Sequence, residues 1–161
     1  MFVPIILTGA LLLYSYYYYA KENKSIVNKL WGSIRPPLKY VYYGSMPLTA
    51  ICFLITLGYL WQLKSQPTLR YKVLFGLFML TFVSLFWMPL ALAYLKNKSA
   101  LYKYGVIATL ITVASFSFYA LYYLTKIKDN NYYKDIAVYS MAYFFIHTFF
   151  FDTLLWSYNF F

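Results

Sequence analysis

Five long apolar runs decide what this chain can fold into. A helix rises about 1.5 Å per residue, so about 20 apolar residues cross the hydrocarbon core of a bilayer. The runs are continuously apolar and lack the alternation that marks the strands of a membrane barrel. We therefore predict an all-α bundle of five transmembrane helices. The predicted spans cover residues 2–20, 46–63, 73–95, 104–124 and 136–160.

Composition supports a membrane protein with a single domain. Charged residues make up 11% of the chain, whereas soluble domains contain about 25%. The length of 161 residues is typical of one domain, so we expect residues 1–161 to form one transmembrane unit without an attached soluble enzyme. The first run has no basic segment before it and no small-residue cleavage signal, so we expect it to be kept as a span.

Positive charge gathers in the loops between the runs. The net charge of +10 would suggest nucleic-acid binding in a soluble chain, but basic loops in a membrane protein set the topology and meet anionic headgroups. We expect the bilayer, and no nucleic acid, as partner. The first and third loops hold eight Lys and Arg, and the second and fourth hold six. This difference slightly favours an N-terminus outside and a C-terminus inside.

The long first loop contains a segment of mixed character. Ile26, Val27, Leu30 and Trp31 have helical spacing next to lysines, and Gly32 with the two following prolines should end the segment. This pattern predicts a short amphipathic helix that lies in the membrane interface. A solvated connector is the alternative.

Ionisable residues inside a span are candidates for function, because a charge in the bilayer is costly unless it is paired or solvated. The predicted spans contain two, His147 and Asp152. At about 100° per residue they would stand about 140° apart around an α-helix, too far for the contact of a nucleophilic triad. Cys52 is the only cysteine, so no disulfide or thiolate metal site can form within the chain. We expect neither an enzyme nor a metal site.

Asp152 shares one α-helical face with Thr148 and Trp156, which are four residues away on either side. This face should point into the bundle. Two interpretations remain open for Asp152: a hydrogen-bonded residue that fixes helix packing, or a residue that binds a ligand or a proton. For His147 a structural role is favoured. In the third span, Pro89 should kink the helix next to Ser84 and Trp87, and such kinks can open cavities.

Three short motifs resemble those of the translocator protein family, the tryptophan-rich sensory proteins, which are five-helix membrane proteins of similar length. Members carry Pro-Pro in the first loop, an Asn-x-x-Trp-x-Pro-like stretch in the third helix, and Leu-Asn-x-x-Ile/Val-Trp-x-x-Asn in the fifth. This chain has these counterparts, in the same order: Pro36-Pro37, Ser84-x-x-Trp87-x-Pro89 and Phe151-Asp152-x-x-Leu155-Trp156-x-x-Asn159.

The resemblance implies a non-enzymatic pocket inside the bundle for a tetrapyrrole or a sterol-like lipid, often in a homodimer. Together with the face of Asp152, it gives one set of candidate ligand-binding residues: Ser84, Trp87, Thr148, Asp152 and Trp156. Both asparagines of the family motifs are replaced, by Ser84 and Asp152. The change to Asp152 puts the identity of the ligand in doubt, because an acid takes the place of a neutral amide.

Two other functional classes fit the same composition. The richness in Tyr, Phe, Lys, Asn and Ile suggests an AT-rich coding source, such as an organelle, a large virus or a parasite. The chain could then be a small accessory subunit of a mitochondrial respiratory complex or of a viral membrane layer, without a ligand site. A proton-coupled carrier that uses Asp152 is the third class, disfavoured because no ionisable partner shares its predicted face.

Overall fold

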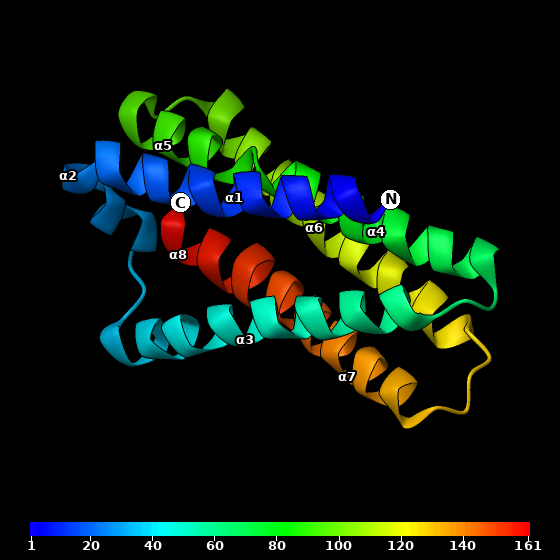
Figure 1. Ribbon diagram of the computed structural model, residues 1–161. Helices are drawn as coiled ribbons and strands as arrows, with labels where there is room; N and C mark the ends of the chain where they lie inside the picture. Colours follow the sequence, from blue (N-terminus) through cyan, green and yellow to red (C-terminus); the bar gives the residue numbers. More distant parts are fainter.

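The structure is a computed structural model that describes all 161 residues. It is helical throughout and contains no strand. Five helices or helix pairs are long and apolar enough to cross a membrane, which confirms the predicted number of long apolar helices. They lie side by side as a bundle, and the two termini lie at opposite ends of it (Figure 1).

The first half of the chain forms two long helices and a short connection between them. Helix α1 covers Phe2–Glu22 and α3 covers Pro36–Gln62. Between them lie α2 (Lys24–Val27) and the 3-10 turn η1 (Asn28–Trp31). The two prolines occupy the first positions of α3, where a missing N–H is tolerated. They begin the second span instead of ending the loop segment, so the loop is shorter than predicted.

The third span is divided into α4 (Pro67–Ser84) and α5 (Trp87–Asn97). The division lies at Leu85 and Phe86, one turn before Pro89. Because proline has no N–H, it cannot bond to the carbonyl four residues earlier, which here belongs to Leu85. Helix α6 (Ala100–Lys126) then runs back along α4 as one unbroken element.

The last span changes its helix type along its length. It begins as the α-helix α7 (Tyr132–Ile146), continues as the π-helical segment η2 (His147–Trp156) and ends with the single turn α8 (Ser157–Phe160). A π-helix bonds each N–H to the carbonyl five residues earlier. The side chains of η2 therefore follow a different order around the helix from the one that α-helical spacing predicts.

Two apolar clusters form the core. One fills the end of the bundle near the α3–α4 connection and includes Ile5, Leu60, Leu77 and Met141. The other fills the opposite end, where the first loop meets α5 and α8. Polar side chains cross between helices as well: Thr8 bonds Thr81 at 2.7 Å, Ser117 bonds Thr148 at 3.0 Å and Ser45 bonds His147 at 2.6 Å.

Candidate functional site

Two tryptophans predicted to line a pocket lie against each other at the first-loop end of the bundle. The ring centroids of Trp87, at the start of α5, and Trp156, at the end of η2, are 5.2 Å apart in an edge-to-face arrangement. The ring of Tyr16 from α1 packs on Trp87 with centroids 5.7 Å apart. Three separate spans thus contribute to one aromatic cluster, which we call the Tyr16–Trp87–Trp156 cluster.

The two indole N–H groups of this cluster differ in their hydrogen bonding. Trp156 Nε1 donates to the carbonyl of Leu30 at 2.8 Å, which ties the first loop to the last span. Trp87 Nε1 is buried and has no acceptor. A buried donor without a partner costs about 1–3 kcal/mol. The cluster therefore offers one free donor to any group that can approach the Trp87 ring.

Asp152 does contact His147, contrary to the prediction. Its Oδ1 lies 3.6 Å from His147 Nε2, with the histidine side chain 5% exposed and the aspartate side chain 29% exposed. The prediction assumed α-helical spacing, but η2 is π-helical, and residues five apart come together in that geometry. The carboxylate accepts no hydrogen bond within the chain, and no Lys or Arg lies within ion-pair distance of it.

The three residues of the expected face, Thr148, Asp152 and Trp156, contact different neighbours. Thr148 is buried and bonds Ser117 of α6 at 3.0 Å, whereas Asp152 contacts His147 on the side of α3. Ser84 turns back on its own helix, where its hydroxyl donates to the Leu80 carbonyl at 2.7 Å. Of the five expected residues, the structure brings Trp87 and Trp156 into direct contact. Tyr16 packs on Trp87 of this pair.

Sequence reasoning missed two polar partners of the last span, both on α3. Ser45 Oγ lies 2.6 Å from His147 Nδ1 and 2.9 Å from the Tyr143 hydroxyl. The Tyr42 hydroxyl donates to the carbonyl of Phe151. Tyr42 and Ser45 are on α3, three residues apart and both buried. The spacing of polar residues on α3 was visible in the sequence, but the expectation of a loop up to residue 45 hid it.

His147 is thus held between two oxygen atoms, with Ser45 at Nδ1 and Asp152 at Nε2. A neutral imidazole donates from one nitrogen and accepts at the other, so this arrangement allows a proton to be exchanged on either side of the ring. No third His, Cys, Asp or Glu joins the pair. The His147 ring also stacks on Phe151, with centroids 5.5 Å apart.

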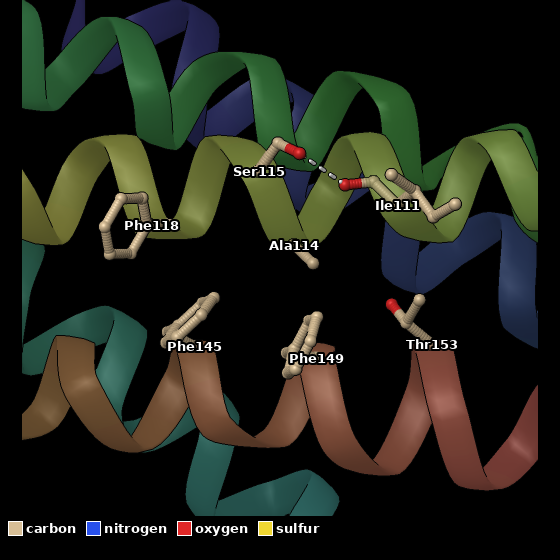
Figure 2. Close-up of a pocket in the computed structure, with 7 residues that line it drawn as sticks. All are labelled: Ile111, Ala114, Ser115, Phe118, Phe145, Phe149 and Thr153. Atoms are coloured by element: carbon tan, nitrogen blue, oxygen red, sulfur yellow. Dashed lines mark hydrogen bonds between the residues drawn. The ribbon is translucent and has the colours of Figure 1, made fainter.

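A hollow lies between α6 and the last span (Figure 2). Its volume is about 270 Å³, and it is lined by Ile111, Ala114, Ser115, Phe118, Phe145, Phe149 and Thr153. The two hydroxyls of this lining are already used: Ser115 donates to the Ile111 carbonyl, and Thr153 donates to the carbonyls of Leu110 and Thr148. The hollow therefore presents an apolar surface.

No model of a known protein family, no curated protein and no solved structure matches this chain. The candidate site is accordingly defined by its own geometry: the Tyr16–Trp87–Trp156 cluster with the free Trp87 donor, and the nearby group of Ser45, His147 and Asp152.

Proposed function

We propose that this chain is a non-enzymatic integral membrane protein that binds an apolar ligand at the Tyr16–Trp87–Trp156 cluster. The observation that carries the proposal is the buried Trp87 Nε1 without an acceptor, in a cluster built by three spans. Aromatic faces favour a flat or ringed ligand. A ligand with a ketone, hydroxyl or carboxylate oxygen would also satisfy the free donor.

The resemblance to translocator proteins supports two ligand classes, tetrapyrroles and sterol-like lipids. Both present rings to the aromatic side chains and carry oxygen atoms that can accept from Trp87 Nε1. Asp152 is partly exposed and has no hydrogen-bond donor, so it favours a ligand with a donor of its own, such as a sterol hydroxyl or a pyrrole N–H.

The proposed setting is a bilayer crossed five times, with the N-terminus outside and the C-terminus inside. Support comes from the five long apolar helices, from termini at opposite ends of the bundle, and from the excess of basic residues in the first and third loops. The composition favours an organellar membrane, such as that of the mitochondrion, or a viral membrane. Segment α2–η1 would lie at the interface, with Lys24 and Lys29 at the headgroups.

The test is fluorescence titration in nanodiscs of zwitterionic lipid, with protoporphyrin IX and dehydroergosterol as separate probes. Both probes absorb light at the wavelengths of tryptophan emission, so binding should quench the tryptophan fluorescence of the protein. We expect Trp87→Leu and Trp156→Leu each to weaken binding of the responding probe by about 1 kcal/mol or more, because aromatic contact is lost. Trp61→Leu is the matched control, since that ring lies 66% exposed on α3.

Equal affinities in wild type, Trp87→Leu and Trp156→Leu would contradict the proposed site. Absence of saturable quenching with both probes would contradict the two ligand classes.

A structural subunit is the second candidate function, and the packing of α1 favours it. Of its 21 residues, Ile5 and Thr8 alone are buried, so α1 leaves most of its apolar surface for lipid or for another membrane protein. Purification in mild detergent distinguishes the two functions. A stable monomer or homodimer supports a protein that works alone, whereas recovery only within a larger complex supports the subunit.

A further inference from the structure

An arginine at the end of the bundle that holds the α3–α4 connection has no partner within the chain. Arg70 belongs to the first turn of α4, and its side chain is partly buried. The Nε atom of its guanidinium is shielded from solvent and has no hydrogen-bond acceptor. No acidic side chain lies within ion-pair distance of it. A buried donor without an acceptor is costly, and more so when it is charged, so an acceptor from outside the chain would stabilise this group.

Two aromatic side chains from neighbouring spans hold Arg70 in place. The central carbon of its guanidinium lies 5.2 Å from the centroid of the Phe2 ring of α1. The Phe2 ring packs against Trp61 of α3 in an edge-to-face arrangement, with centroids 4.9 Å apart, and also packs on the buried apolar cluster at this end of the bundle. A cation is attracted to the face of an aromatic ring. The stack therefore fixes the planar guanidinium and the direction of its N–H donors.

This end of the bundle is positively charged. The second and fourth loops and the helix turns beside them hold six Lys and Arg but two acids, Asp129 and Asp135. Both carboxylate oxygens of Asp129 already accept hydrogen bonds within the chain. The side chain of Gln66 ties the two loops together through hydrogen bonds of 2.8 and 3.0 Å with the backbone of Lys128. The resulting field attracts an anion and disfavours a second cation.

The surroundings of Arg70 match the boundary between headgroups and acyl chains. Trp61, at the end of α3, is 66% exposed, and Tyr71, next to Arg70, is 57% exposed. Exposed Trp and Tyr near the ends of spans are typical of the membrane interface. One turn farther into α1 from Phe2, the apolar side chain of Ile6 is also exposed. A group bound at Arg70 would therefore have apolar helix surface next to it on the side of the membrane core.

We propose that Arg70 binds the phosphate group of an anionic phospholipid where α1, α3 and α4 meet. The paired N–H donors of a guanidinium match two oxygens of one phosphate, and the acyl chains lie on the exposed apolar surface of α1. A lipid with net negative charge is favoured, because a choline headgroup would bring another cation next to the six basic residues. This site lies at the opposite end of the bundle from the Tyr16–Trp87–Trp156 cluster, so the inference goes beyond the proposed ligand site.

The test is native mass spectrometry of the purified protein in non-ionic detergent at physiological ionic strength. The protein is titrated separately with a phosphatidylglycerol and with a phosphatidylcholine that has the same acyl chains. We expect the first phosphatidylglycerol to bind wild type more tightly than the first phosphatidylcholine. Arg70→Gln should weaken this first binding step at least about tenfold, because charge-assisted hydrogen bonds are lost. Arg70→Lys keeps the charge but loses the forked donors, so its affinity should fall between those of wild type and Arg70→Gln.

Lys72→Gln is the matched control, because it removes the same charge two residues later in α4. The two positions stand about 200° apart around the helix, and the Lys72 ammonium packs over the Tyr123 ring of α6 at 4.5 Å. The control should keep the affinity of the first step within about twofold, since salt screens distant charges. Three results would overturn the proposal: equal affinity of wild type for the two lipids, equal losses in Arg70→Gln and Lys72→Gln, which would indicate general attraction to a basic surface, or displacement of the lipid by millimolar inorganic phosphate, which would indicate a site for a soluble anion.

Discussion

At the residue scale, Gly32 shows how one position ties the first loop to the last span. Its φ is +51°, a region that side chains rarely adopt. A Cβ there would also overlap the carbonyl of Asn159. That carbonyl accepts from the Ser33 backbone N–H at 2.9 Å, and the Asn159 side-chain oxygen accepts from the Ser33 hydroxyl at 3.0 Å. The close approach of two backbones therefore requires glycine.

Gly32→Ala should destabilise the protein. The strained backbone alone costs about 1–3 kcal/mol, and the overlap would push the loop away from Trp156 and Asn159. Cys52 is the only thiol and is 7% exposed, so a thiol-reactive dye reports unfolding on heating. We expect a clearly lower midpoint for Gly32→Ala, and an unchanged or higher one for Gly9→Ala, whose Cβ would meet nothing within 4 Å. Equal midpoints would contradict this role of Gly32.

At the element scale, the π-helical segment η2 decides which residues form the candidate site. The sequence predicted five long apolar helices, because apolarity over about 20 residues is a strong signal. Through the resemblance it also predicted that Trp87 and Trp156 bind a ligand, which stays a prediction; the structure shows that their two rings are in contact. The prediction that His147 and Asp152 stand too far apart for contact was wrong. A local change from i−4 to i−5 hydrogen bonding leaves no recognisable pattern in the sequence. Likewise, Pro36 and Pro37 are compatible with the end of one helix or with the start of the next. The packing of the helices determines that they begin α3.

A double-mutant cycle tests the π-helical geometry of η2 directly. If His147 and Asp152 share a face, the unfolding free energies of His147→Phe and Asp152→Asn should not add, and the coupling should reach about 0.5 kcal/mol or more. Reversible SDS unfolding in mixed micelles measures all four variants of the cycle. The same cycle between His147→Phe and Thr153→Ser provides the control. Additivity of the first pair would favour a regular α-helix through residue 156.

At the scale of the whole molecule, basic residues and polar contacts lie in different parts of the bundle. The basic residues lie near the ends of the helices, where several pack over aromatic rings: Lys39 over Trp31, Lys72 over Tyr123, and Lys103 over Phe161. Such pairs suit the headgroup region, which holds both amphipathic rings and cations. The middle of the bundle has polar contacts but one contact between ionisable side chains, that of His147 with Asp152. The proposed ligand site depends on this bundle crossing a bilayer.

The most direct test of that central claim is the sidedness of the four loops. In a Cys52→Ala background, single exposed cysteines can be placed one in each loop. The account predicts that a membrane-impermeant maleimide labels Ser25→Cys and Asn97→Cys from one side of sealed vesicles, and Ser65→Cys and Asn130→Cys from the other side. Labelling of all four from the same side would contradict five membrane crossings, and with them both proposed functions.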